Sequence, residues 1–224
     1  GVEEGLEQVE LVSLGPTTVY AVGGHSCFQD YKLSSVEKYD PEENEWTTVA
    51  PMSTKRYAFG VAAVGGLLYA VGGEDENNTP LRTVECYVPS TNSWSPTASM
   101  HTPRKWLSVG VLGGLIYAVG GKNKNNEILS SMERYDPATN TWSVVASMNT
   151  RRYCCSVAVV NGLLYAVGGY DENNNRLSSM ERYDPVANTW TLVAPMPEAQ
   201  SEMSVAVLDG LVYVIGGVGG NEKT

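Results

Sequence analysis

Three arginines occupy one repeated position of the sequence. Arg56, Arg104 and Arg152 each follow a methionine by four residues, and Gln200 takes the same place in a later copy of the pattern. A guanidinium group presents a fork of N–H donors that matches a carboxylate in a bidentate way. Gathered on one surface, such groups would bind an acidic segment. The spacing therefore predicts carboxylate recognition.

Residues for catalysis or metal binding do not occur in a suitable pattern. His25 and His101 are the only histidines, and the four cysteines form no Cys-x-x-Cys pair. No Gly-x-Ser-x-Gly motif is present, and the Gly-Gly pairs end apolar runs without opening a helix that could hold phosphate. We therefore expect no catalytic residue, no metal and no cofactor, and we expect that the chain is not an enzyme.

The composition of the chain argues against nucleic-acid and membrane partners. The chain has 224 residues with 15 Lys and Arg against 25 Asp and Glu, a formal net charge of −10. A nucleic-acid binder needs a basic surface, so no nucleic-acid partner is expected. No apolar run reaches the roughly 20 residues of a membrane helix, and no membrane partner is expected. Cysteines without a pairing framework are typical of a reducing compartment, which predicts a cytoplasmic protein.

A period of about 48 residues runs through the chain. Several residue types keep it independently, which indicates an internal repeat. The repeated residues are Trp46, Trp94, Trp142 and Trp190; Tyr39, Tyr87, Tyr135 and Tyr183; Met52, Met100, Met148 and Met196; and the Gly-Gly pairs beginning at Gly23, Gly72, Gly120, Gly168 and Gly216.

Each period is predicted to form four strands. In the second copy these are residues 57–64, 67–71, 83–88 and 93–98, with Gly65-Gly66 as a two-residue hairpin turn. Sheets that are apolar on both faces bury themselves by stacking around an axis, and the repeated tryptophan is expected to pack between them. The prediction is an all-β propeller forming a single domain over 1–224. Its units are 7–50, 57–98, 105–146 and 153–194, with a partial unit at 200–217.

The repeated motifs resemble Kelch repeats, most closely those of the BTB–Kelch (Kelch-like) substrate adaptors. They are Tyr-Ala-Val-Gly-Gly, Ser-Met-Glu-Arg-Tyr-Asp-Pro, Asn-Thr-Trp and Met-x-x-x-Arg, and they cover Val19 to Gly217. Propellers of this family usually have six blades. Six repeats of 48 residues would need 288, against the 224 of this chain. We expect a fragment of a six-bladed ring or an unusual closure.

Strand direction predicts where a partner would bind. The loops after Gly-Gly (25–34, 74–82, 122–130 and 170–178) and the crossings from each methionine to the next inner strand lie at one end. The candidate partner-binding residues there are Arg56, Arg104, Arg152, Gln200, Tyr57, Lys105, Tyr153, Tyr170, His25 and Phe28. Two alternatives remain open: the arginines could bond to backbone carbonyls between blades, and Tyr57 and Tyr153 could pack between blades.

The resemblance also implies a function. In this family, arginines at the Met-x-x-x-Arg position line a pocket for peptide degrons. The implied role is a protein–protein interaction module that binds an acidic peptide or protein segment. It would be the substrate-recognition part of a cullin-type E3 ubiquitin ligase adaptor, whose BTB domain is not in this chain. The first alternative is an actin- or cytoskeleton-binding Kelch domain. The second is a small Kelch-propeller enzyme acting on a sugar.

Overall fold

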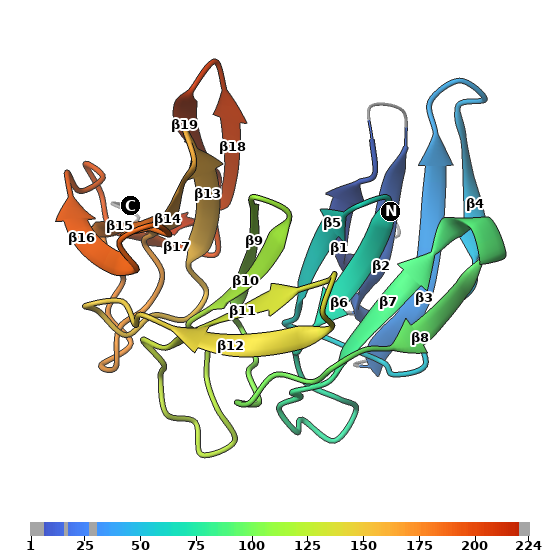
Figure 1. Cartoon of the computed structure of the whole chain (residues 1–224), viewed down its shortest axis with the longest axis horizontal. Coiled ribbons are helices and arrows are strands. Elements are labelled where there is room, and N and C mark those ends of the chain that lie inside the picture. Colours follow the sequence, from blue (N-terminus) through green and yellow to red (C-terminus); the bar gives the residue numbers. More distant parts are fainter. Residues whose placement is uncertain (1–6, 16–17, 27–30, 220–224) are drawn as a thin grey trace, which may run out of the picture. The chain divides into compact units, whose positions relative to one another are not determined.

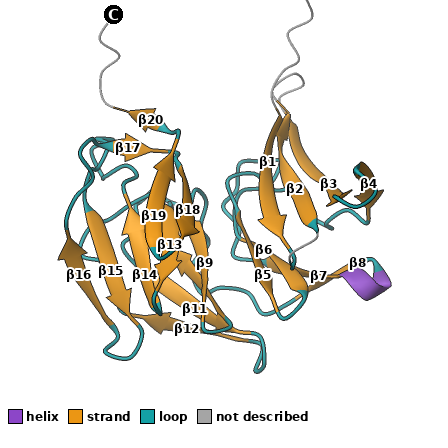
Figure 2. Cartoon of the chain, turned by 90° about the horizontal axis from the view of Figure 1, so that it is seen from above, coloured by secondary structure: helices purple, strands orange, loops and turns teal. Residues whose placement is uncertain are grey.

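The computed structural model describes residues 7–15, 18–26 and 31–219 of the chain. These residues form strands joined by short turns and loops, and their one helical turn is the 3-10 turn η1 (Pro89–Thr91), purple in Figure 2. Among them, no helix has the length and hydropathy needed to cross a membrane. The chain divides into two compact units, Gly1–Lys105 and Trp106–Thr224, which are described separately.

The first unit contains two four-stranded antiparallel sheets in which the strands follow each other in chain order (Figure 1). The strands of one sheet are β1 (Glu7–Ser13), β2 (Val19–Ser26), β3 (Tyr31–Asp40) and β4 (Glu45–Val49). Those of the other are β5 (Gly60–Val64), β6 (Leu67–Val71), β7 (Val84–Val88) and β8 (Ser93–Pro96).

The second unit repeats this plan twice and adds two strand pairs (Figure 1). Its four-stranded sheets are β9 (Ser108–Leu112), β10 (Leu115–Val119), β11 (Met132–Asp136) and β12 (Thr141–Val145), then β13 (Ser156–Val160), β14 (Leu163–Val167), β15 (Met180–Asp184) and β16 (Thr189–Val193). The strand pairs are β18 (Ser204–Leu208) with β19 (Leu211–Ile215), and β17 (Gln200–Ser201) with β20 (Val218–Gly219). The predicted set of four complete sheets and one half sheet is confirmed.

The tight turns between inner strands have the predicted geometry. Gly65 and Gly66 have φ of 58° and 78°, and Asn161 and Gly162 have φ of 50° and 75°. Two successive positive φ values are what a type I′ hairpin turn requires, and glycine and asparagine tolerate them. These turns fix the register, so that Val64 pairs with Leu67 across the first of them.

Three of the predicted strand boundaries in the second sheet are wrong: β7 begins one residue later, β8 ends two residues earlier, and the inner strand differs most. The inner strand of the second sheet begins at Gly60, three residues later than expected. Tyr57 makes an isolated bridge with Glu74, and Ala58 has a left-handed φ of 53° that a regular strand does not accommodate. The segment before β5 is therefore a crossing at the loop end, and its side chains are available for other contacts.

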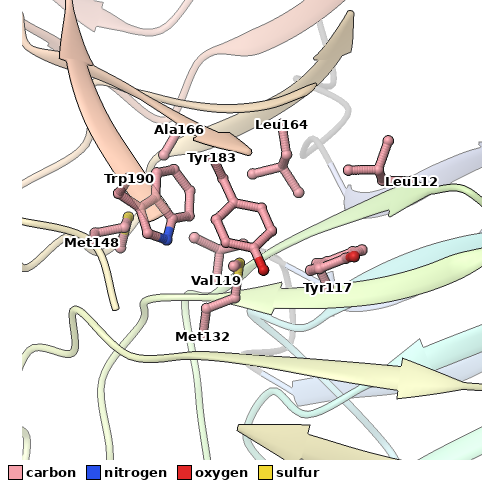
Figure 3. Packing of buried hydrophobic residues seen from close by; sticks show 9 residues of the cluster. All are labelled: Leu112, Tyr117, Val119, Met132, Met148, Leu164, Ala166, Tyr183 and Trp190. Atoms are coloured by element: carbon pink, nitrogen blue, oxygen red, sulfur yellow. The ribbon is translucent and has the colours of Figure 1, made fainter. Parts of the chain in front are cut away.

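Buried aromatic and aliphatic side chains join the two complete sheets of the second unit. Figure 3 shows the Tyr183 ring between Trp190 and Tyr117, and the Tyr117 and Tyr183 centroids are 5.9 Å apart. Leu112 and Leu164 belong to the same cluster. Removing each such side chain from water stabilises the fold by about 1.5–3 kcal/mol. The apolar packing between sheets therefore holds this unit together.

The repeated tryptophans also connect neighbouring sheets by hydrogen bonds. The Trp94 indole Nε1 donates to the Ala50 carbonyl, and Trp190 Nε1 donates to the Ala146 carbonyl, each at 2.9 Å. The predicted packing role is confirmed for these two. Trp46 differs: 51% of its surface is exposed, and its ring centroid lies 5.2 Å from that of Tyr39 in its own sheet.

Candidate functional site

The side chain of Arg56 is completely buried beneath the loop end of its own sheet. It is 0% exposed. Its Nη1 donates to the carbonyls of Gly72 at 2.8 Å and Thr83 at 3.0 Å, and its Nη2 donates to Glu85 Oε1 at 2.9 Å. The guanidinium group thus satisfies carbonyls at the Gly-Gly break, where the ladder between β6 and β7 has ended.

The same arrangement recurs in the second unit. Arg152 is 0% exposed, and its Nη1 donates to the carbonyls of Gly168 at 3.0 Å and Ser179 at 2.8 Å. Its Nη2 donates to Glu181 Oε1 at 3.1 Å. Arg104 is likewise 0% exposed. The prediction that the three arginines gather on one binding surface is therefore wrong, because all three side chains are buried in the fold.

The alternative, that the arginines bond to backbone carbonyls between blades, is correct about the carbonyls but not about their place. The side chains of Arg56 and Arg152 bond within their own sheets, and it is the main chain that reaches the neighbouring sheet. The Arg56 carbonyl accepts a hydrogen bond from Gly24 N–H at 3.0 Å, and the Arg152 carbonyl accepts one from Gly121 N–H at 2.8 Å. The arginine position is a structural joint between consecutive repeats.

The glutamate partner of Arg56 is kept charged. Burial alone would raise the pKa of Glu85, but hydrogen bonds from Ser53 and Arg56 outweigh that effect and lower it. Ser53 donates from both its N–H and its hydroxyl to Glu85 Oε2, at 2.7 and 2.6 Å. Burial lowers the pKa of Arg56, which its contacts with Glu85 partly offset. The pair is thus an internal ion pair with its hydrogen-bonding capacity used.

Gln200 and Phe28 are two further candidate partner-binding residues. Gln200 repeats the main-chain role of the arginines, because its carbonyl accepts a hydrogen bond from Gly169 N–H at 2.9 Å. It lies in β17 and is half-buried. Phe28 lies outside the described residues, so its predicted role in partner binding stays a prediction.

The residues beside the arginines vary from repeat to repeat. The position after the arginine holds Tyr57, Lys105, Tyr153 and, after Gln200, Ser201; the position after Gly-Gly holds His25, Glu74, Lys122, Tyr170 and Val218. We call each residue after Gly-Gly, together with the residue that follows the next Met-x-x-x-Arg arginine (or Gln200) along the chain, a junction pair. The same main-chain joint that fixes the arginine brings these side chains together.

Each junction pair in the described units has its own chemistry. The His25 and Tyr57 rings are 5.1 Å apart between centroids. Glu74 and Lys105 form an ion pair of 2.7 Å in which both side chains are buried. Of the candidate partner-binding residues, the structure places His25 beside Tyr57 and Tyr153 beside Tyr170, whereas Lys105 contacts a carboxylate of its own chain.

A hollow of about 450 Å³ opens beside the first of these pairs, within the first unit. We call it the first-unit pocket. It is lined by His25, Lys32, Lys55, Tyr57, Glu74, Glu76 and Asn78. Sequence reasoning missed Lys32, Glu74 and Asn78. Lys32 and Glu74 are buried, and polar residues in a polar loop carry no sign of burial.

The pocket floor is a fixed network of charges. The ammonium group of Lys32 lies 3.0 Å from Glu74 Oε1 and donates to the Asp75 carbonyl at 2.5 Å and to Asn78 Oδ1 at 2.7 Å. Glu74 therefore lies between two lysines, Lys32 and Lys105. Lys55 pairs with Glu76 at 3.2 Å near the opening, where both side chains are exposed. The lining thus holds two lysines, Lys32 and Lys55, and two glutamates, Glu74 and Glu76, and Lys105 pairs with Glu74 from beside it.

The second unit carries aromatic rings at the corresponding positions. Tyr153 and Tyr170 are stacked with centroids 5.0 Å apart and an interplanar angle of 23°. The Lys122 ammonium lies 3.7 Å from the Tyr153 centroid and 5.1 Å from that of Trp106. We call Trp106, Tyr153 and Tyr170 the aromatic row. Trp106 was not among the predicted site residues.

Within the described ranges, no three His, Cys, Asp or Glu side chains are grouped so that they could hold a metal ion. The geometry at the loop end is that of a surface with fixed charges and partly exposed rings. Such a surface can hold a charged or flat group of a partner by ion pairs and stacking.

Comparison with known proteins places this geometry in a family. The KLHDC2/KLHL20/DRC7 Kelch-repeats domain matches residues 9–217. Mouse Kelch-like protein 1 is 56% identical over 43 residues, which are 19% of this chain and 6% of that protein. Human Kelch-like protein 13 is 35% identical over 67 residues, 30% of this chain and 10% of that protein. Human Kelch-like protein 5 is 58% identical over 40 residues, 18% of this chain and 5% of that protein. The matched segments thus span no more than a tenth of these relatives.

A solved structure shares the fold. The structure of YjhT has a TM-score of 0.79 to this chain at 17% identity, and the match covers 92% of this chain and 71% of that one. YjhT is a Kelch-type propeller with an assigned enzymatic activity. It contradicts the expectation, drawn from the missing motifs, that this chain is not an enzyme. The resemblance stated from the motifs is confirmed: the chain is a Kelch-type β-propeller and belongs to the KLHDC2/KLHL20/DRC7 Kelch-repeats domain family.

Proposed function

We propose that this chain binds a segment of another protein at the end that carries the junction pairs. The observation that carries the proposal is the first-unit pocket, a hollow of about 450 Å³ whose charged lining is held in place by its own hydrogen bonds. Preorganised polar groups in a concave site give binding its orientation and specificity. The similarity to Kelch-like proteins supports a recognition role.

The partner segment is proposed to present an acidic side chain. Lys32 and Lys105 already neutralise Glu74, and Lys55 pairs with the exposed carboxylate of Glu76. An exposed ion pair of this kind contributes little, about 0–1 kcal/mol. A partner carboxylate can therefore take Lys55 from Glu76 at small cost.

In the whole protein, the proposed role is substrate recognition for a cullin-type E3 ubiquitin ligase. This part rests on the similarity to Kelch-like proteins, of which the matched segments are a small share. The cullin contact would be made through a BTB domain, and the protein would act in the cytoplasm. Actin binding is the alternative partner, and cosedimentation of the chain with filamentous actin distinguishes it.

The proposal predicts that pocket substitutions weaken a selected ligand. Twelve-residue peptides rich in Asp and Glu would be selected from a display library on the purified chain, and their Kd measured by calorimetry. Lys55→Glu reverses the charge at the opening and should weaken the selected peptides about 10-fold or more, the scale of a lost charge-assisted hydrogen bond. Tyr57→Ser should also weaken them, and Ser201 shows that the repeat accepts serine there.

The matched control is Arg151→Glu. Arg151 occupies the repeat position of Lys55 in the second unit and pairs loosely with Glu172 at 3.9 Å. It should leave the affinity unchanged. If Lys55→Glu and Tyr57→Ser both fold and bind the peptides as tightly as the original chain, the pocket is not the binding site.

A further inference from the structure

The aromatic row of the second unit combines features that a packing role alone does not explain. Trp106, Tyr153 and Tyr170 are all partly exposed at the loop end. Trp106 and Tyr153 have centroids 5.9 Å apart, and Tyr153 stacks on Tyr170 at 5.0 Å. Three large rings in one partly open line are the residue type that anchors protein interfaces.

Trp106 is held in an unfavourable backbone conformation. Its φ is 52°, in the left-handed region that bulky residues rarely adopt. The corresponding positions of the other repeats hold Ala58, Cys154 and Glu202, also with positive φ, so the fold does not need a large side chain here. A strain of about 1–2 kcal/mol is retained at such a position when the side chain serves another purpose.

The row already holds a cation. The ammonium group of Lys122 lies 3.7 Å from the centroid of Tyr153 and 5.1 Å from that of Trp106, inside the about 6 Å range of a cation–π contact. At the other end of the row, the guanidinium carbon of Arg176 lies 5.8 Å from the Tyr170 centroid. The rings thus accept both kinds of cationic side chain from their own chain.

Carboxylates favour the same kind of occupant. The Tyr170 hydroxyl donates to Glu202 Oε1 at 3.3 Å, and Glu202 is exposed. Asp171 lies next in the chain and acts electrostatically on Tyr153. The charge of the whole chain, −10, attracts cations to this surface as well.

We propose that the aromatic row is a recognition site for a cationic side chain, arginine or lysine, of a partner protein, and that Lys122 occupies this site when the partner is absent. The partner cation displaces Lys122 and lies against Tyr153 and Trp106. Arginine suits the site best, because its planar group stacks on aromatic faces and is weakly hydrated. This proposal does not depend on the first-unit pocket, which is proposed for a group of opposite charge.

The proposal makes an unusual prediction for Lys122→Ala. If Lys122 competes with the partner cation, its removal strengthens binding. If Lys122 were instead the contact for an anionic ligand, the same substitution would weaken binding. One variant therefore separates the two interpretations of the same residue.

The experiment uses the full chain and three capped tripeptides, Ac-Gly-Arg-Gly-NH2, Ac-Gly-Lys-Gly-NH2 and Ac-Gly-Glu-Gly-NH2. Proton NMR of the peptides follows binding, since a side chain stacked on rings shifts upfield. The arginine and lysine peptides should shift and the glutamate peptide should not. Lys122→Ala should lower the Kd of the arginine peptide about threefold or more, the scale of one exposed cation–π contact.

Substitutions taken from the repeat itself test the rings. Trp106→Ala and Tyr153→Ser introduce residues found at Ala58 and Ser201, and both should abolish the upfield shift. Tyr57→Ser in the first unit is the matched control and should not change it. Thermal melting checks that each variant folds, and Tyr170→Val, which introduces the residue type found at Val218, replaces any that does not.

Two results would overturn the proposal. One is an arginine-peptide affinity that Lys122→Ala leaves unchanged or weakens. The other is an upfield shift that survives in folded ring variants, or that the glutamate peptide shows equally. Neither result bears on the acidic-peptide experiment at the first-unit pocket, so the two proposals fail separately.

Discussion

The guanidinium group of Arg56 is 0% exposed, and its Nε and both of its Nη nitrogens donate hydrogen bonds. Arg56→Ala would leave the Glu85 carboxylate buried beside unsatisfied carbonyls. Breaking such a pair from one side costs about 3–5 kcal/mol of unfolding free energy. We expect a loss of this size in urea unfolding. Lys55→Ala, next to it in the chain, removes only an exposed ion pair and should change the free energy by about 1 kcal/mol or less.

The two variants together decide the role of the arginine position. A near-equal, small loss for Arg56→Ala and Lys55→Ala would contradict the internal role. It would instead favour the role in binding a partner carboxylate that the sequence predicts.

Glu10 in β1 carries the clearest pH dependence of a single residue. Burial raises its pKa from 4.5 to about 7. A raised pKa means that the folded state disfavours the charged form, so its stability falls as the pH rises from about 4.5 to about 7. Glu10→Gln should remove this dependence and stabilise the chain by about 1–2 kcal/mol at pH 8, a value reduced from the full shift because the side chain is only partly buried.

The measurement is the unfolding free energy at pH 4 and pH 8 for both chains. Relative to the original chain, Glu10→Gln should have a higher unfolding free energy at pH 8 and the same unfolding free energy at pH 4. An equal gain at both pH values would show that Glu10 acts through packing and not through its charge.

The residue-scale errors of the sequence analysis have a physical origin. Glu37, Glu85, Glu133 and Glu181 recur with the same period of 48 residues as Arg56, Arg104 and Arg152. Arg56 and Glu85 are 29 residues apart, and so are Arg152 and Glu181. Opposite charges that recur at a constant separation should be expected to pair, and that signal was present in the sequence.

At the scale of elements, the Gly-Gly break after β14 brings the chain close to the segment that leads into β13 of the same sheet. A Cβ on Gly169, which has φ of 91°, would lie 2.7 Å from the Tyr153 carbonyl and 2.8 Å from Cys155 Cβ. Gly162, with φ of 75° in the turn between β13 and β14, has nothing within 4 Å of such a Cβ. Gly169→Ala should therefore lower the free energy of unfolding by more than about 2 kcal/mol, and Gly162→Ala should lower it by about 1 kcal/mol.

Urea unfolding of the two glycine variants tests this contrast. Because both glycines have positive φ, the difference between the variants isolates the close approach of the chains. Equal losses would mean that backbone conformation alone makes glycine necessary at the Gly-Gly break.

The elements themselves were predictable because their signals are local. Alternating apolar residues and two-residue turns define β5–β6 and β13–β14 without reference to the rest of the chain. The crossing at Tyr57–Phe59 was not predictable in this way. Its conformation depends on the bridge from Tyr57 to Glu74, a contact between residues of different elements.

At the scale of the whole molecule, β18 and β19 present an apolar surface. Leu208, Leu211 and Ile215 are 61%, 60% and 57% exposed. Exposed strands of this kind promote association between chains. We expect concentration-dependent self-association in sedimentation velocity, and Leu211→Lys with Ile215→Lys should reduce it.

The control for this prediction is Val186→Lys. Val186 is 95% exposed but lies in the turn between β15 and β16, away from β18 and β19. It should leave sedimentation unchanged. Association that persists in the double variant, or that Val186→Lys also abolishes, would exclude β18 and β19 as the contact surface.

The number of sheets was predictable from the period of 48 residues, because each copy of the motif forms one sheet. That the two compact units form a single domain over 1–224 stays a prediction. It depends on long-range packing that a repeat pattern does not encode.

The hidden arginine has a consequence for how such chains diversify. Arg56, Arg104 and Arg152 are buried, while the junction residues beside them differ from repeat to repeat. Successive junction pairs therefore combine histidine with tyrosine, glutamate with lysine, and lysine with tyrosine on the same backbone arrangement. Selection can exchange one partner for another there while the architecture is inherited unchanged.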